Sequence, residues 1–190
     1  MRLVIAAVAV VGFGLDQGTK ALALALLDPA RPIPLLGGLV TLRLTDNPGA
    51  AFSMGEGFTV GLTIVAMAAF VGVAGWLAPR VRHPGWAVGT GLLLAGILGN
   101  LTDRLLRPPG PFHGYVIDFM QLRYFAIFNV ADMCITAAAV IIAWLAIIVQ
   151  VSPSGVRAKS RKRAGGSRKP VRRTYTEKEE TYTNDEERSA

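Results

Sequence analysis

The sequence predicts an all-α integral membrane protein with four transmembrane helices, a small extracytoplasmic β element and a disordered basic C-terminal tail. Three observations predict this fold class. Hydrophobic residues make up 52% of the 190 residues and charged residues only 17%, whereas soluble domains average about a quarter charged residues. Three runs, residues 58–78, 85–102 and 133–149, carry no charge, and each reaches or borders the roughly 17–25 apolar residues that cross a bilayer as a helix. The last stretch, residues 152–190, is polar and has no apolar periodicity, which is typical of disorder.

A fourth span is predicted at the N-terminus, from Leu3 to Leu27. This stretch is apolar except for Asp16 and Lys20. A cleaved signal peptide is the alternative, because Arg2 precedes the apolar stretch and Ala-Leu-Ala sequences follow. An acid and a base inside the stretch are unusual in a signal peptide but typical of a helix that faces the interior of a functional bundle. We therefore favour a retained helix.

The distribution of basic residues predicts the orientation. Four spans place both termini on one side, where fourteen of the twenty Lys and Arg residues lie, and five lie in the two loops of the other side. Basic residues are enriched in cytoplasmic loops, and long tails weigh less in this rule than short loops. The best evidence is therefore the short link between the second and third spans, which contains Arg80 and Arg82. Both termini are predicted to be cytoplasmic.

The basic tail is predicted to form a separate region. We expect a four-helix transmembrane domain over residues 1–151 and a disordered cytoplasmic tail over residues 152–190, which hold eleven basic and six acidic residues. Attraction to anionic lipid head groups is the simplest role for a basic segment beside a membrane span. Nucleic-acid binding is not expected, because no module that reads nucleic acid accompanies the charge.

The two outer loops are predicted to contain extended segments. The first loop, residues 28–57, is rich in Pro and Gly, and residues 39–44 within it alternate and are rich in strand-forming residues. This pattern favours a short strand or hairpin. The second loop, residues 103–128, has three prolines within residues 107–111, which prevent a continuing helix. Residues 115–119 that follow are expected to be extended.

Four aspartates are predicted to gather near the outer membrane face. Charged groups within the hydrocarbon region are costly, and proteins keep them for function. Asp16 lies past the middle of the outgoing first span, and Asp103 ends the third span. Asp118 follows in the second outer loop, and Asp132 begins the fourth span. Topology alone thus places four carboxylates in one layer.

Each of these aspartates also has a purely structural interpretation. Asp16 and Lys20 are four residues apart on a helix and could simply neutralise each other. Asp103 could form an interfacial pair with Arg104. Asp132 begins a helix and could complement its dipole. Asp118 could be a solvated acid of the second outer loop.

The chemistry available to these side chains is limited. His83 is predicted on the cytoplasmic side and His113 is the single histidine of the outer loops, so the clustered ligands of a metal site are not expected. The sequence has no Gly-x-Ser-x-Gly motif. Two carboxyl groups about 3 Å apart share one proton, and such a pair can activate water to hydrolyse a peptide bond. The prediction is paired-carboxylate chemistry without a metal or a cofactor.

Five short pieces of sequence lie in these spans and loops. They are Asp16-Gln17-Gly18-Thr19-Lys20, Asn47-Pro48-Gly49-Ala50-Ala51-Phe52-Ser53, Gly99-Asn100-Leu101-Thr102-Asp103-Arg104, Val116-Ile117-Asp118-Phe119 and Phe128-Asn129-Val130-Ala131-Asp132. In their order and spacing they resemble the lipoprotein signal peptidase family, also called signal peptidase II. The resemblance covers about residues 3–150. The second and fifth pieces are specific in combination, although each alone is weak.

The resemblance implies a membrane aspartic endopeptidase of the bacterial cytoplasmic membrane with its active site toward the extracytoplasmic face. It implies that diacylglyceryl-modified prolipoproteins are the substrates and that their signal peptide is cut immediately before the lipidated cysteine. Asp118 and Asp132 would form the catalytic dyad that activates water, and a monomer is expected. Other residues of the pieces are implied to bind substrate or to support the dyad: Asp16, Lys20, Asn47, Gly49, Ala50, Phe52, Asn100, Asp103, Arg104, Asn129 and Ala131.

Two positions depart from the family pattern. Members usually carry Gly-Gly in the third span, where this sequence has Ala95-Gly96, and Met133 is bulkier than the residue expected after the second dyad acid. Both departures bear on local packing and not on the chemistry. The basic tail lies outside the resemblance.

A small proton-coupled transporter is the alternative function, because intramembrane acids with a Lys and an Arg also form proton relays. Transporters usually show internal repeats and broken helices at the membrane midplane. This sequence shows no repeat, and its acids gather on one face. A non-enzymatic membrane scaffold that uses the basic tail is a second alternative.

Overall fold

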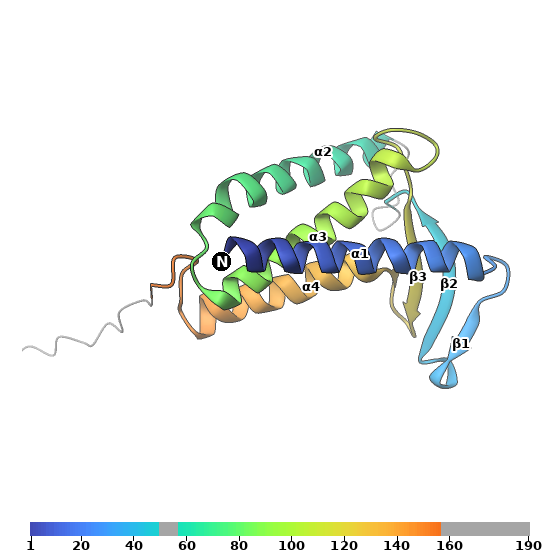
Figure 1. Cartoon of the computed structure of the whole chain (residues 1–190). Helices are drawn as coiled ribbons and strands as arrows, with labels where there is room; N and C mark the ends of the chain where they lie inside the picture. Colours follow the sequence, from blue (N-terminus) through green and yellow to red (C-terminus); the bar gives the residue numbers. More distant parts are fainter. Residues whose placement is uncertain (50–56, 157–190) are drawn as a thin grey trace, which may run out of the picture. The chain divides into compact units, whose positions relative to one another are not determined.

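The computed structural model of the chain describes residues 1–49 and 57–156. They belong to a compact unit, Met1–Ala158, in which helices carry a small sheet at one end (Figure 1). The second unit, Lys159–Ala190, lies outside the described residues, and so does most of the predicted disordered tail. The helices are α1 (Arg2–Leu26), α2 (Gly57–Val71), α3 (Pro84–Leu106) and α4 (Val130–Ala143), and the strands are β1 (Ile33–Leu35), β2 (Val40–Asn47), β3 (Val116–Leu122) and β4 (Ile127–Phe128).

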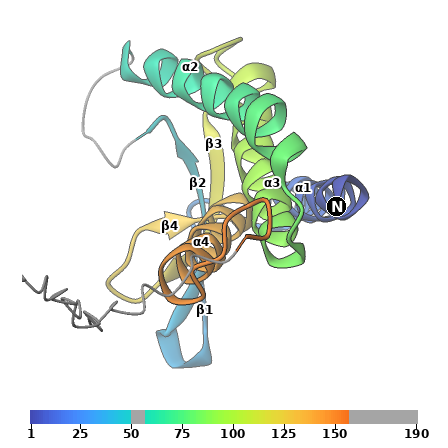
Figure 2. The same cartoon turned by 90° about the vertical axis from the view of Figure 1, so that its left-hand side faces the viewer.

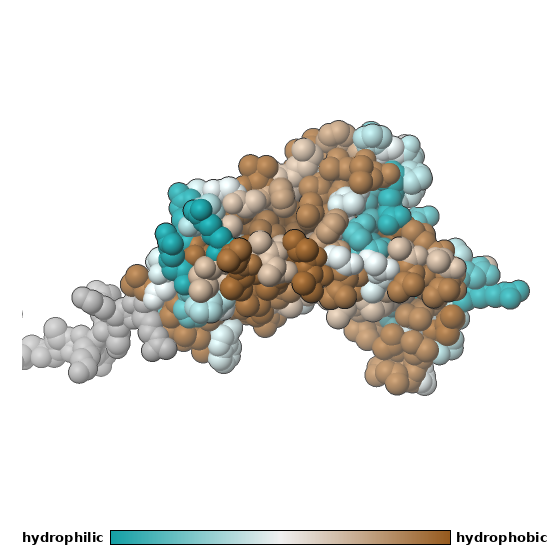
Figure 3. Space-filling model, viewed as in Figure 1, coloured by the Kyte–Doolittle hydropathy of each residue, from teal (hydrophilic) through white to brown (hydrophobic). Residues whose placement is uncertain are grey.

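Within the described residues, four helices are long and apolar enough to cross a membrane. They cover Arg2–Leu26, Thr59–Arg80, Pro84–Leu106 and Val130–Ile148, because π-helical turns extend α2 and α4. The surface along the helices is largely hydrophobic, and hydrophilic residues gather toward the two ends (Figure 3). Four helices of spanning length are therefore confirmed at the predicted positions to within a few residues.

α3 is the central helix of the bundle. It packs against each of the other three helices, as the view from the N-terminal end shows (Figure 2), and 61% of its most apolar stretch is buried, against 6% for α2. Small residues allow α1 to approach it closely. A Cβ on Gly91 would lie 2.7 Å from the Cβ of Val8, and a Cβ on Gly12 would lie 2.7 Å from the Cβ of Ala95. Ala95 is therefore accommodated in place of the family's usual glycine because Gly12 faces it.

The sheet is antiparallel with the strand order β1-β2-β3-β4. The extended segments predicted at residues 39–44 and 115–119 are confirmed from residue 40 in β2 and from residue 116 in β3. Their register places Thr45 opposite Asp118 and Asn47 opposite Val116. β1 and β4 were not predicted, because three and two residues are too few to show a periodic pattern.

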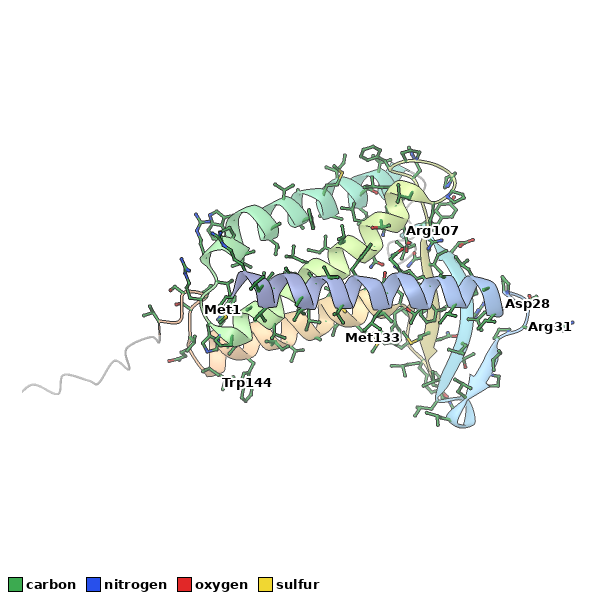
Figure 4. All side chains as sticks on the ribbon, viewed as in Figure 1. Met1, Asp28, Arg31, Arg107, Met133 and Trp144 are labelled. Atoms are coloured by element: carbon green, nitrogen blue, oxygen red, sulfur yellow. The ribbon has the colours of Figure 1, made fainter. Side chains whose placement is uncertain are left out.

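The bundle has two distinct ends. Met1 and Trp144 lie at one end, which we call the N-terminal end, and Asp28, Arg31 and Arg107 lie at the other (Figure 4). The sheet lies at this second end, which we call the sheet end (Figure 1). Because β4 leads directly into α4, the start of α4 also lies at the sheet end.

Candidate active site

Asp118 is a buried carboxylate on β3. It is 2% exposed. Asn47 Nδ2, at the end of β2, donates a hydrogen bond to its Oδ2 over 2.7 Å, and Asn129 Nδ2 donates to its Oδ1 over 2.6 Å. Burial raises the pKa of Asp118 from 3.8 to about 6, and the charge of Asp132 acts in the same direction, whereas the two asparagines and Lys20 lower the pKa.

Asp132 lies in the first turn of α4 and is half-buried. Asn129 is the N-cap of this helix: its Oδ1 accepts the backbone N–H of Asp132 over 3.1 Å, and Asp132 Oδ2 accepts the backbone N–H of Asn129 over 3.1 Å. This reciprocal pair is a capping box. Asn100 Nδ2 donates to the remaining oxygen, Oδ1, over 2.8 Å. Both oxygens of Asp132 are therefore held by donors at the start of α4.

Asn129 joins the two carboxylates. It is fully buried, and its side chain contacts Asp118 while the same residue caps the helix through Asp132. Its Nδ2 also donates to Asn100 Oδ1 over 3.1 Å, and Asn100 holds the other side of Asp132. Two acids fourteen residues apart in the sequence therefore belong to one hydrogen-bonded cluster at the sheet end.

Lys20 is a buried cation between two further aspartates. Its Nζ lies 2.9 Å from Asp16 Oδ2 and 2.7 Å from Asp103 Oδ2, and all three side chains are completely buried. Lys20 Nζ also donates to Asn100 Oδ1 over 3.0 Å. The expected pairing of Asp16 with Lys20 is present, but it is part of a wider network that reaches Asp132 through Asn100.

Asp16 also connects α1 to the start of α4. Its Oδ1 accepts the backbone N–H of Ala131 over 2.8 Å, and its Oδ2 accepts Gln17 Nε2 over 3.0 Å. Gln17 donates in addition to the carbonyl of Gly99 on α3 over 3.2 Å. A Cβ on Gly99 would lie 2.5 Å from Asp16 Oδ2, so only glycine leaves room for this carboxylate. No role was predicted for Gln17, although a polar amide side chain inside a membrane span indicates a contact with another helix.

Asp103 pairs differently from the structural interpretation offered by the sequence. Besides Lys20, it contacts Arg107, whose Nε lies 2.6 Å from Asp103 Oδ1, and its Oδ2 accepts the backbone N–H of Ile117 over 3.3 Å. The expected ion pair with Arg104 is not found among the described residues, because adjacent helical residues point in different directions. Asp103 thereby fixes β3 beside α3.

Arg104 is half-buried, and one of its guanidinium nitrogens is buried without a hydrogen-bond partner among the described residues. Its Nη1 makes no hydrogen bond to any residue within 1–49 or 57–156. The negative charges that act on it are those of Asp118, Asp103 and Asp132. A buried unsatisfied donor is costly, so an unpaired guanidinium nitrogen near the two candidate catalytic acids points to a ligand that supplies an acceptor.

The Asn47-Pro48-Gly49 segment forms a tight turn next to Asp118. Asn47 Oδ1 accepts the backbone N–H of Gly49 over 2.8 Å, and Gly49 has a φ of 112°, which favours glycine. Thr59 on α2 donates to the carbonyl of Pro48 over 2.7 Å, a contact that the sequence did not predict. The segment therefore forms a tight turn, and Asn47 within it also contacts Asp118. The predicted site residues Ala50 and Phe52 lie outside the described residues.

A groove of about 460 Å³ opens beside Asp132. The groove has Asp132 in its wall and is otherwise mainly apolar. Met133 is 51% exposed, so the bulk that departs from the family pattern projects into this groove region and does not disturb the helix packing. The lining residues are Leu122, Phe125, Phe128, Asp132, Met133, Thr136 and Ala137.

The cluster suits acid–base chemistry. It contains one half-buried carboxylate that is stabilised at a helix N-terminus and one buried carboxyl group whose pKa is raised to about 6. A carboxyl group with a pKa near neutrality can act as a general acid. In residues 1–49 and 57–156, no group of three His, Cys, Asp or Glu side chains has the arrangement of a metal site.

Comparisons with known proteins agree with this architecture. The family described as signal peptidase (SPase) II matches residues 8–148. A lipoprotein signal peptidase of Mycobacterium avium (strain 104) is 44% identical over 147 residues, which cover 77% of this chain and 80% of the relative. A lipoprotein signal peptidase of Rhodococcus jostii (strain RHA1) is 44% identical over 156 residues, covering 82% and 78%.

A solved structure shows the same fold. It is a bacterial membrane enzyme determined by the in meso method at 1.9 Å resolution, with a TM-score of 0.65 and 24% identity over 74% of this chain and 90% of that one. Together with the four candidate spans, the matches indicate a multi-pass bacterial membrane protein. The family match covers most of the chain and includes all the acids of the cluster, so the chain belongs to the signal peptidase II family.

Proposed function

We propose that the protein is a membrane aspartic endopeptidase that removes the signal peptide of diacylglyceryl-modified prolipoproteins by cutting immediately before the lipidated cysteine. Family membership supports the substrate class, since the curated relatives are named lipoprotein signal peptidases. The observation that most supports the dyad is the position of Asn129 between the two acids. Its side-chain amide donates to Asp118, and its side-chain oxygen accepts the backbone N–H of Asp132.

In the proposed reaction, Asp132 is the base and Asp118 is the acid. Asp132 takes a proton from water as the water attacks the scissile carbonyl carbon, and Asp118 donates its proton to the carbonyl oxygen. The pKa of about 6 supports this role for Asp118, because an acid works best when its pKa is near the working pH. When the tetrahedral intermediate collapses, a hydroxyl proton returns to Asp118, and the departing amine takes the proton that Asp132 removed from water.

The surrounding residues are proposed to orient the dyad and the substrate. Asn100 and Asn129 fix the two carboxyl groups, and the Lys20 network holds Asn100 in place. Arg104 is proposed to donate its unpaired Nη1 to a carbonyl oxygen of the substrate backbone. An extended peptide has carbonyl groups that can satisfy such a donor.

The groove beside Asp132 is proposed to hold an apolar part of the substrate next to the scissile bond. The charge distribution supports a site that faces the extracytoplasmic side, with both termini in the cytoplasm. The acids gather at the sheet end, whereas a proton-coupled transporter would need polar groups along both halves of its bundle. We further propose that the protein acts as a monomer.

Asparagine substitutions test the dyad. Purified protein in detergent is incubated with a diacylated prolipoprotein, and cleavage is followed by gel shift and by mass spectrometry of the released peptide. We expect Asp118→Asn and Asp132→Asn each to reduce the cleavage rate by at least about a hundredfold, because each removes a titrating carboxyl group and keeps the side-chain shape.

The matched control is Asp28→Asn, which makes the same change at an exposed acid and should cleave like the wild type. Full activity in either dyad variant would remove that residue from the mechanism. Cleavage in detergent also requires no ion gradient, so a wild-type protein that fails to cut under any condition would revive the transporter alternative.

A further inference from the structure

A second pocket lies at the N-terminal end of the bundle, away from the carboxylate cluster. It has a volume of about 420 Å³ and is formed by the link between α2 and α3 together with the residues that follow α4. Its wall combines two arginines with an indole ring and small polar or apolar groups. The lining residues are Trp76, Leu77, Pro79, Arg80, Arg82, Pro153 and Ser154.

Hydrogen bonds fix the two chain segments that form this pocket. The backbone N–H groups of Arg82 and His83 both donate to the carbonyl of Pro153, over 2.8 and 3.3 Å. Trp86 Nε1 on α3 donates to the carbonyl of Val151 over 2.9 Å, and Gly155 closes a turn by donating to Ser152. Residues 152–156, which the sequence assigned to the tail, therefore form an ordered wall.

The pocket carries positive charge that no acid of the described residues neutralises. Arg80 and Arg82 are exposed, and neither forms an ion pair with any acid in the described part of the chain. Arg80 is held in place by Trp76, because its guanidinium lies 4.8 Å from the ring centroid and its Nη1 donates to the carbonyl of the same residue. The acids of the described residues lie in α1, in the sheet-end loops and strands, or at the sheet-end ends of α3 and α4.

The aromatic residues mark the depth of this pocket in the membrane. Trp76 is 63% exposed and Trp144 is 58% exposed, and Trp144 lies at the same end of the bundle (Figure 4). Exposed tryptophans are enriched at the level of the lipid head groups. Arg80 and Arg82 follow Trp76 at the end of the second candidate span, so we expect their guanidinium groups at the height of lipid phosphates.

We propose that this pocket binds the phosphate-bearing head group of an anionic phospholipid. Arginine donors match phosphate oxygens in geometry as well as in charge. A lipid fits better than free phosphate because Trp76 and Leu77 connect the pocket to α2, of whose most apolar stretch only 6% is buried, so that acyl chains can lie along the exposed side of this helix. The proposal does not depend on the peptidase reaction. The pocket residues also precede residues 157–190, which hold all the basic residues of the predicted tail.

Lipid binding to the full-length protein tests the proposal. Protein in detergent is titrated with phosphatidylglycerol or with phosphatidylcholine of the same acyl chains, and bound lipid is counted by native mass spectrometry. We expect the wild type to bind phosphatidylglycerol more tightly. Arg80→Gln/Arg82→Gln should weaken this binding roughly 25-fold, since each basic residue near an anionic lipid surface contributes about a factor of five.

Two matched variants locate the effect. Arg31→Gln/Arg43→Gln removes two exposed charges from the sheet end and should bind phosphatidylglycerol like the wild type. Replacing Arg161, Lys162 and Arg163 by Gln in the full-length chain should leave the high-affinity site intact. The proposal is overturned if the pocket variant binds like the Arg31→Gln/Arg43→Gln control, or if only the tail variant loses binding.

Two further measurements distinguish a lipid site from a free-phosphate site and from a loss of folding. Inorganic phosphate at the same concentration should not displace phosphatidylglycerol, and displacement would show a free-phosphate site instead. Thermal unfolding without added lipid should give the same midpoint for the pocket variant and the wild type. If the pocket variant unfolds early, Arg80→Lys/Arg82→Lys keeps the charge and loses only the planar donor geometry. It should then bind more weakly than the wild type, and wild-type affinity would contradict the proposed recognition by arginine.

Discussion

Asp118 accepts an amide hydrogen bond at each oxygen, yet its pKa is raised. The hydrogen bonds favour the carboxylate, whereas burial and the nearby negative charge of Asp132 favour the neutral acid. Burial is the largest of these effects. A carboxyl group that accepts hydrogen bonds from two donors can therefore still hold a proton where water is excluded.

The raised pKa predicts a pH dependence of stability. Because the folded-state pKa of about 6 is above the ordinary value of 3.8, the folded protein binds this proton more tightly than the unfolded chain. The stabilising contribution is complete below about pH 4 and is lost as the pH rises through about 6. Between pH 4 and 7 the wild type should lose up to about 3 kcal/mol that Asp118→Asn does not lose.

Thermal unfolding in detergent across this pH range measures the difference. Asp46→Asn, at an exposed acid on β2, is the control and should follow the wild type. Parallel pH profiles for the wild type and Asp118→Asn would show that burial does not perturb this carboxyl group.

Individual partners were the hardest feature to predict from the sequence. The structural interpretation of Asp103 paired it with the adjacent Arg104, but it contacts Arg107, one turn further along the same helix. Residues four apart lie on one helix face, and adjacent residues do not. The second partner of Asp103, Lys20, comes from another helix. No local pattern in the sequence predicts a contact between residues so far apart in the chain.

At the level of elements, the start of α4 serves both the helix and the cluster. Asn129 caps the helix through its Oδ1 and contacts Asp118 through its Nδ2. One residue thus makes the geometry of the cluster depend on the position where a helix begins.

Substitutions at Asn129 separate these two roles. Asn129→Ala loses the cap and the contact with Asp118, so we expect a loss of about 1–2 kcal/mol in stability together with a large loss of cleavage. Asn129→Ser keeps a capping oxygen but cannot donate in the same way to both Asp118 and Asn100. Its thermal stability should approach that of the wild type while its cleavage rate stays low. Recovery of both properties in the serine variant would show that the amide contact has no role in the reaction.

The sheet illustrates which elements a local pattern can reveal. β2 alternates over residues 40–44, and this first part of the strand was predicted, but β1 contains a proline in three residues and β4 has only two. These short strands exist because they pair with the edges of β2 and β3. Their stability comes from long-range pairing, which the sequence of the strands themselves does not show.

At the scale of the whole molecule, the sequence was most informative about the membrane spans and the layer of acids. Span length is a property of composition, and the grouping of the acids follows from the order of the spans along the chain. The contacts among Asp16, Gly99 and Ala131 were not predictable in the same way, because they require α1, α3 and α4 to approach each other closely.

The orientation in the membrane remains a prediction that labelling can test. In a Cys134→Ser background, which removes the single buried cysteine, Arg31→Cys and Ser154→Cys place a thiol at exposed positions of the sheet end and the N-terminal end. In intact bacterial cells, a membrane-impermeant maleimide should label position 31 and should reach position 154 only after permeabilisation. The opposite pattern would place the dyad in the cytoplasm.

The central position of α3 has a consequence for biogenesis. Ribosomes make α1 and α2 first, and both find their main helix partner only when α3 is synthesised. Until then we expect α1 to lie in lipid with two ionisable side chains. Asp16 and Lys20 lie one turn apart in this helix and can neutralise each other without α3, because their ion pair is formed within α1. The two opposite charges then cancel within α1. When α3 packs against α1, Asp103 also contacts Lys20, and the ion pair within one helix becomes an ionic contact that joins two helices.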